Sequence, residues 1–135
     1  MTGPLAGAVL DHVGTEETDI DARVGFLVEL LGFQVLRWGV HVVTGRRIAM
    51  LADPRGTKLE LMEVAERTGE LDHVAYRVAD VDAAHACLVA AGCTEERAPF
   101  DIPPARARSS LLREAAGHRL QLISYRADSP DLTGT

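Results

Sequence analysis

Two segments of the chain, Lys58–Val64 and Arg119–Tyr125, each open with four residues that alternate between polar and apolar types. Alternation with a period of two predicts a β-strand that is buried on one face. The leucines of each segment share a face, and an acid or an amide lies opposite them: Leu59 and Leu61 against Glu60, and Leu120 and Leu122 against Gln121. If the leucines pack in a core, Glu60 and Gln121 point away from it.

The second of these segments repeats the first, as part of a longer repeat. Leu10–Val13 (Leu-Asp-His-Val) recurs 61 residues later as Leu71–Val74, with the same four residue types. At the same offset, Asp19–Ala22 matches Asp80–Ala83. A repeat of this length dictates the architecture. We therefore expect one domain over residues 1–135, with module one at 5–64, a linker at 65–69, module two at 70–126 and a loose tail at 127–135.

Each module predicts a strand, a helix and three more strands. The opening strands are expected at 8–16 and 71–79, and the helices at 22–31 and 83–91, capped by Asp19 and Asp80. Module one continues with strands at 34–43, 46–52 and 58–64. In module two, strands are expected at 108–114 and 119–125, and Phe100–Pro104 as a loop. The fold class is α+β, with two tandem βαβββ modules; neither has enough core alone, so their sheets should meet.

The opening strand of each module carries a histidine, at His12 and His73. Alternation places His73 and Arg77 on the face away from the helix, and the repeat does the same for His12 and Glu16. If the two sheets face one another, four potential ligands converge: His12, Glu60, His73 and Gln121. An isolated strand histidine is usually a satisfied surface or core residue. Two imidazoles at equivalent positions, with a carboxylate and an amide oxygen, favour a divalent metal ion instead: Zn, Ni, Co, Mn or Fe.

Composition narrows the classes of partner. The chain has 135 residues, 47% of them hydrophobic and 25% charged, and a net charge of -6. The acidic balance argues against nucleic acid or an anionic membrane as the partner. No apolar run approaches the roughly 18 residues that span a bilayer, and no signal peptide is recognisable. The two cysteines do not form a CxxC pair, so we expect a cytoplasmic protein.

Four motifs carry a resemblance to a known family: Asp11–Gly14, Asp53–Leu61, Asp72–Ala75 and Gly117–Leu122. Together with the paired βαβββ units, they resemble the vicinal oxygen chelate superfamily, which includes glyoxalase I, methylmalonyl-CoA epimerase, fosfomycin-resistance enzymes, extradiol dioxygenases and bleomycin-resistance proteins. The resemblance implies curved sheets that form a cup-shaped site, and a homodimer. It also implies that His12, Glu60, His73 and Gln121 are the metal ligands, and that the cup lies within one chain or across two.

The resemblance implies a metal-dependent epimerase, isomerase or lyase that acts on a small carbonyl compound through a metal-stabilised enediolate. Glu60 is the expected base, because Gln121 cannot take a proton, and Glu16 is a second candidate proton carrier. Arg77 is a candidate for binding an anionic group of the substrate. Trp38 and Phe100 are either core residues or walls of the substrate cup. A secondary-metabolite substrate is equally compatible with the sequence.

Two other functions of the same fold remain open. A metal-free antibiotic-binding protein would lack ligands and use aromatic walls, whereas here the ligand types are present and the aromatic content is 4%. An Fe(II)-dependent dioxygenase uses two histidines and one carboxylate, which this sequence also offers.

Overall fold

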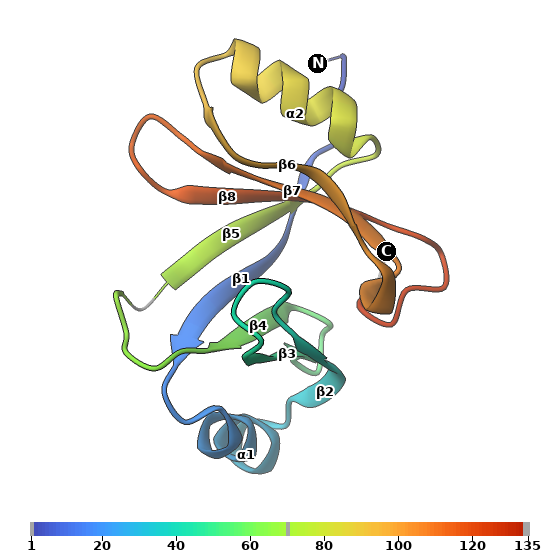
Figure 1. Ribbon diagram of the computed structural model, residues 1–135. Helices are drawn as coiled ribbons and strands as arrows, with labels where there is room; N and C mark the ends of the chain where they lie inside the picture. Colours follow the sequence, from blue (N-terminus) through green and yellow to red (C-terminus); the bar gives the residue numbers. More distant parts are fainter. Residues whose placement is uncertain (1, 70, 134–135) are drawn as a thin grey trace. The chain divides into compact units, whose positions relative to one another are not determined.

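The computed structural model describes residues 2–69 and 71–133, which form a mixed α+β fold (Figure 1). Its elements follow the order expected for two βαβββ modules: β1 (Val9–Glu17), α1 (Ile20–Leu31), β2 (Gln34–Val40), β3 (Arg47–Ala52), β4 (Lys58–Glu63), β5 (Leu71–Arg77), α2 (Val81–Ala90), β6 (Thr94–Ile102), the 3-10 turn η1 (Pro103–Ala105), β7 (Ala107–Arg113) and β8 (Arg119–Tyr125). The chain divides into two compact units. The module-one unit contains residues 12–72 and 130–133, and the module-two unit contains 2–11 and 73–129.

In the module-one unit the strands lie in the order β2-β3-β4-β1, with β1 parallel to β4 and the other neighbours antiparallel. Helix α1 covers one face of this sheet (Figure 1). The core between them consists of apolar side chains from both: Ile20, Leu27, Ala49, Leu51 and Leu61. Asp19 caps the helix by accepting a hydrogen bond from the Ala22 amide at 3.1 Å, as predicted. Gly32 ends it in the left-handed region at φ 74°.

The module-two unit repeats this arrangement with the order β6-β7-β8-β5. Strand β5 is parallel to β8, and β6–β7 and β7–β8 are antiparallel. Helix α2 packs on one face of the sheet (Figure 1), and the core there contains Val78, Val81, Ala84, Leu112 and Leu122. Asp80 caps the helix through the Ala83 amide at 3.1 Å, which confirms the second predicted cap. Each unit therefore buries one face of its sheet under its own helix.

The strand β6 corrects the prediction of a loop at Phe100–Pro104, because Phe100–Ile102 belong to this strand. Its sequence is polar and includes Pro99, which lacks the amide proton that an inner strand needs. β6 lies at the edge of its unit's sheet, and its pairing with β7 shifts register twice, between Glu95 and Arg97 and between Arg97 and Phe100. An edge position tolerates both features, and so this strand has no clear sequence signature.

The segment after β8 differs from the expected loose tail. Ser129 and Asp131 are both buried, and Asp131 belongs to the module-one unit although β8 belongs to the other. Thr133 donates a hydrogen bond from Oγ1 to the carbonyl of Gly56 at 2.7 Å. Ser129, Asp131 and Thr133 are therefore held in place, and the residues from Arg126 to Asp128 are exposed. Within the described ranges, neither helix has the length and apolar character needed to cross a bilayer.

Candidate metal-binding residues

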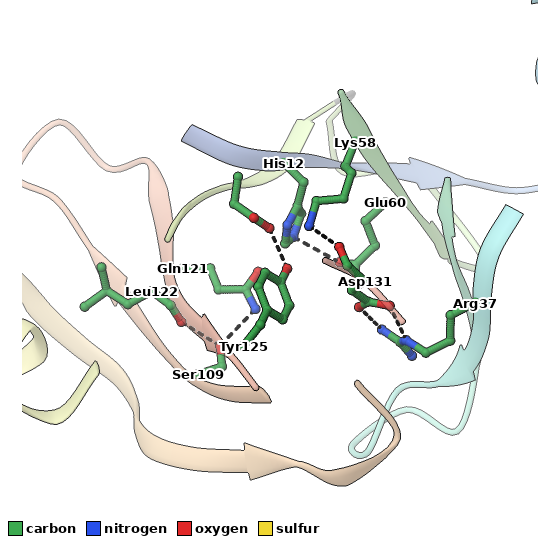
Figure 2. Close-up of polar contacts among 10 residues, drawn as sticks. His12, Arg37, Lys58, Glu60, Ser109, Gln121, Leu122, Tyr125 and Asp131 are labelled. Carbon is green, nitrogen blue, oxygen red and sulfur yellow. Dashed lines mark hydrogen bonds and ion pairs between the residues drawn. The ribbon is translucent and has the colours of Figure 1, made fainter. Parts of the chain in front are cut away.

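His12 and Glu60 lie together on the face of the module-one sheet that α1 leaves uncovered. Nε2 of His12 is 3.9 Å from Oε1 of Glu60, and both residues are buried (Figure 2). They come from the neighbouring parallel strands β1 and β4, where Glu60 is the register partner of Gly14. Leu61, the next residue on β4, packs in the α1 core. The predicted alternation is therefore present, and it brings a histidine and a carboxylate together.

His73 and Gln121 occupy the corresponding positions in the module-two unit. Both are buried, and Gln121 is the register partner of Ala75 on the parallel strand β5. The amide Nε2 of Gln121 donates to Oγ of Ser109 at 2.9 Å (Figure 2). That hydroxyl donates its own proton to the carbonyl of Leu122 at 2.8 Å, so it can only accept from Gln121. This chain of hydrogen bonds determines which end of the amide is the nitrogen.

The two units therefore place their candidate ligands in the same register. In each unit, the closing strand carries the residue with the potential ligand oxygen, and this residue is the register partner of the residue two positions after the histidine. The pairs are Gly14 with Glu60 and Ala75 with Gln121. A shift of one residue would move either side chain to the opposite face. The agreement is independent in the two units, because it rests on separate strand pairs. Each unit thus presents one imidazole and one side-chain oxygen from adjacent strands.

Glu16, predicted as a second proton carrier, is held by the linker between the modules. Its Oε1 accepts hydrogen bonds from the amides of Thr68 (3.0 Å) and Gly69 (2.7 Å) and from Oγ1 of Thr68 (2.9 Å). Nε of Arg67 also donates to the main-chain oxygen of Glu16 at 3.2 Å. A buried carboxylate with three donors on one oxygen serves to anchor this linker. The contacts of Glu16 therefore indicate a structural residue.

Trp38, predicted as a possible wall of a substrate cup, lies on the other face of its sheet. Its register partner is Ala49, which packs in the core beneath α1. The guanidinium of Arg47 stacks on the indole at 5.5 Å from the ring centre, and 42% of Trp38 is exposed. Glu63 of β4 also faces this side and accepts a hydrogen bond from the Arg47 amide at 3.0 Å. Neither side chain shares a face with His12 and Glu60.

Arg77 and Phe100 share the uncovered face of the module-two sheet with Gln121. Arg77 is the register partner of Ile123, two residues after Gln121 on β8. Phe100 pairs with Ser109, and Ser109 pairs with Ile123, so these residues form one row across the sheet. The guanidinium of Arg97 lies 3.6 Å from the ring centre of Phe100. Their positions are compatible with the predicted contacts to a substrate, which remain a prediction.

Ion pairs flank both sheets and hold carboxylates in the charged form. Hydrogen bonds from Arg119 lower the pKa of Glu96, and Arg113 adds to this effect. The side chain of Arg47 lowers the pKa of Asp21, and hydrogen bonds from its amide and its side chain do the same for Glu63. These groups lie outside the candidate ligand set, and they tie strands and helices together at the surface.

Sequence reasoning missed three charged residues on the face that carries His12 and Glu60. Lys58 and Arg37 reach this face from β4 and β2, and both contact Asp131 of the C-terminal segment (Figure 2). Lys58 and Glu60 are two residues apart in β4, so the alternation of this strand already indicates that they share a face. No local pattern marks Asp131, because its partners lie 73 and 94 residues away.

A family model described as the glyoxalase/bleomycin resistance protein/dioxygenase superfamily matches residues 9–122 of this chain. The match covers both modules, from the first residue of β1 to Leu122 in β8. A comparison with curated proteins found none that matches.

Several solved structures are similar to the chain over most of its length. A methylmalonyl-CoA epimerase in complex with methylmalonyl-CoA and NH4+ has a TM-score of 0.74 and 27% identity, covering 89% of this chain and 96% of that one. A variant of the Streptomyces coelicolor methylmalonyl-CoA epimerase in complex with 2-nitronate-propionyl-CoA has a TM-score of 0.73 and 26% identity, covering 87% and 97%. A hypothetical protein from Bacillus halodurans, at 22% identity and a TM-score of 0.74, shares the fold and covers 91% and 98%.

Proposed function

Because the chain belongs to the glyoxalase/bleomycin resistance protein/dioxygenase superfamily, we propose that it is a divalent-metal-dependent epimerase, isomerase or lyase acting on a small carbonyl compound. The observation that supports this most is the matched register of the two units, Gly14 with Glu60 and Ala75 with Gln121. The similarity to methylmalonyl-CoA epimerases at 26% and 27% identity supports the same general class of reaction.

The residue types fit a divalent metal ion. His12, Glu60, His73 and Gln121 offer two imidazole nitrogens, one carboxylate and one amide oxygen, and all four are buried. Such a mixed nitrogen and oxygen set suits Zn, Ni, Co, Mn or Fe(II). We propose that the four residues form one centre, either within a chain or across a homodimer. When bound, the metal supplies a Lewis acid that polarises a carbonyl and stabilises the enediolate of the substrate.

Glu60 is the proposed base that takes the proton from the carbon next to the carbonyl. It is the one member of the proposed set with a carboxylate, and Gln121 cannot accept a proton in its place. Glu16 is engaged by the linker through three donors on one oxygen. The chain therefore supports a proton shuttle with a single base. Such a shuttle is sufficient for an isomerisation or an elimination, and an epimerisation needs a second proton carrier in addition.

Metal content of the purified protein tests the proposal. We expect about one divalent ion per chain in the wild type, and a loss of most of it in His12→Ala and Glu60→Ala. His118→Ala is the matched control, because His118 is exposed and follows the turn before β8. It should retain the metal. Equal metal content in the wild type and the two ligand variants would refute the metal centre.

The chemistry of the loaded protein then separates the alternatives. Exchange of solvent deuterium into a carbonyl compound, with Zn, Co, Ni or Mn bound, supports enolisation. A protein that holds Fe(II) and consumes oxygen would be a dioxygenase of the same fold. Two histidines and one carboxylate are also a ligand set for Fe(II) in such enzymes. A metal-free protein that binds an antibiotic in a fixed ratio would be a sequestering protein. The last two results would each overturn the proposed reaction.

A further inference from the structure

Two cations of the module-one unit, the buried Lys58 and the partly buried Arg37, contact a single residue of the C-terminal segment. Nε and Nη2 of Arg37 donate to Oδ1 and Oδ2 of Asp131 at 2.8 and 2.9 Å, a two-pronged contact (Figure 2). Nζ of Lys58 donates to the main-chain oxygen of Asp131 at 2.5 Å. The side chains of Arg37 and Asp131 are only 11% and 1% exposed. The guanidinium of Arg37 and the ammonium group of Lys58 thus both contact Asp131, the first at its carboxylate and the second at its main-chain oxygen.

This cluster shares the sheet face of the candidate ligands. Arg37 pairs with Met50 and Met50 pairs with Glu60, so Arg37 and Glu60 lie in one row across β2, β3 and β4. Lys58 is the register partner of His12. Cross-strand partners point to the same side of a sheet. Lys58 therefore lies beside His12, and Arg37 lies on the same face two strands away from Glu60.

The segment that supplies the carboxylate has no regular structure of its own. Residues 130–133 belong to no helix or strand, and Thr133 adds a hydrogen bond to the carbonyl of Gly56. These residues can leave the face without breaking a strand pair. A second ion-pair cluster of this unit is different, because Arg47 of β3 pairs with Asp21 of α1 and Glu63 of β4, and the core holds these elements in place.

We propose that Arg37 and Lys58 form a carboxylate-binding subsite beside Glu60, and that the segment 130–133 occupies it as an internal competing ligand. An arginine fork that meets a carboxylate in two parallel hydrogen bonds is the geometry by which proteins recognise this group. This inference rests on the proposed function and deepens it: the substrate is a carbonyl compound that carries a carboxylate. Its binding displaces Asp131 and releases the segment.

Binding of malonate to the full-length chain tests the subsite. Calorimetric titration is done on protein treated with a chelator, so that the result does not depend on the metal centre or on turnover. A site that is mostly occupied by its own segment binds an added ligand weakly, in proportion to the open fraction. Asp131→Asn removes the competing carboxylate and should tighten malonate binding by about tenfold or more. Neutral malonamide should not bind any variant.

Two further variants guard against misfolding and indirect effects. Thr133→Val keeps Arg37 paired and removes only the hydrogen bond to Gly56; a bond of ordinary strength predicts a gain of about threefold to tenfold. In the double variant Arg37→Met/Asp131→Leu, an apolar pair replaces the ion pair, so neither partner of that pair is left as an unpaired charge, and the main-chain oxygen that Lys58 contacts is kept. It should fold and should not bind malonate.

Asp128→Asn is the matched control, because Asp128 lies just before this segment in the sequence and pairs with Arg106. It should bind malonate as the wild type does. The subsite is refuted if Asp131→Asn and Thr133→Val leave the affinity unchanged, if Asp128→Asn raises it equally, or if the double variant still binds. If the metal-content test fails but the malonate titrations give the expected results, the protein binds carboxylates and does not perform the proposed metal chemistry.

Discussion

The hydroxyl of Ser109 determines the orientation of the amide of Gln121. Ser109 gives its proton to the carbonyl of Leu122, so it accepts from the nitrogen of Gln121, and the amide oxygen lies at the other end of the group. A metal ion binds an amide through its oxygen. Ser109, a buried residue of the neighbouring strand β7, thus orients the amide of Gln121 for its proposed role as a ligand.

Ser109→Ala should therefore weaken metal binding while the fold is retained. Removal of a partner that orients a ligand commonly costs about 10- to 100-fold in metal affinity. The measurement is a titration of the metal-free protein with Zn or Co. Ser110→Ala is the control, since Ser110 is equally buried but lies beside His85. Equal metal affinity in the wild type and Ser109→Ala would show that the orientation of Gln121 does not matter for binding.

His85 should contribute to the stability of the module-two unit. It is buried in α2, with Nδ1 at 2.8 Å from Oγ of Ser110 and Nε2 at 2.7 Å from Oε1 of Glu95. His85→Ala leaves the buried hydroxyl of Ser110 without this partner, so we expect a loss of about 1–3 kcal/mol in the free energy of unfolding. Denaturant titration measures it. The exposed His118 provides the control, and a loss of similar size in His118→Ala would contradict the explanation.

Glu96 should make stability depend on pH in the acidic range. Hydrogen bonds from Arg119 hold its pKa below that of the unfolded chain. A depressed pKa contributes stability that is present above the unfolded pKa of about 4.3 and is lost as the pH falls through the folded value. Glu96→Gln should be less stable than the wild type at neutral pH, and the difference should shrink toward pH 3. Arg119→Gln should reproduce this trend. A difference that stays constant with pH would exclude the mechanism.

Glu16 should control the opening of the linker that contains Arg67, Thr68 and Gly69. Glu16→Gln removes the charge that accepts from Thr68 and Gly69, and such charge-assisted bonds are worth about 1.5–3 kcal/mol. Trypsin, which cuts after arginine, should then cleave at Arg67 about tenfold faster or more, since cleavage follows the open population. Glu29→Gln makes the same change in charge on the exposed side of α1. It should not affect cleavage, and equal acceleration in both variants would refute the anchoring role.

Much of the fold follows from patterns that are local in the sequence. The strand at Arg119–Tyr125 has the predicted bounds, and both aspartate caps are where the repeat places them. These features depend on alternation and on hydrogen bonds between residues three positions apart, so the sequence displays them directly. β6 lacks such a pattern because an edge strand with register shifts tolerates proline and polar residues.

The candidate site divides in the same way. Alternation and the repeat place His12 with Glu60 and His73 with Gln121 on the faces that the helices leave uncovered, and the register of each unit agrees. Trp38 lies on the other face because the pairing of β2 with β3 shifts by one residue between Val35 and Arg37. Strict alternation from the first residue of β2 therefore assigns Trp38 to the wrong face.

The sequence by itself determined the two modules, their helices and the residues that lie opposite the core, because these depend on short periods and on a repeat of fixed length. Only the tertiary structure decided that Asp131 reaches Arg37 and Lys58, that the linker holds Glu16, and that Ser109 orients Gln121. Those contacts join residues that are 12 to 94 positions apart. They arise from the way the backbone brings distant segments onto one sheet face, for which no local pattern of residues exists.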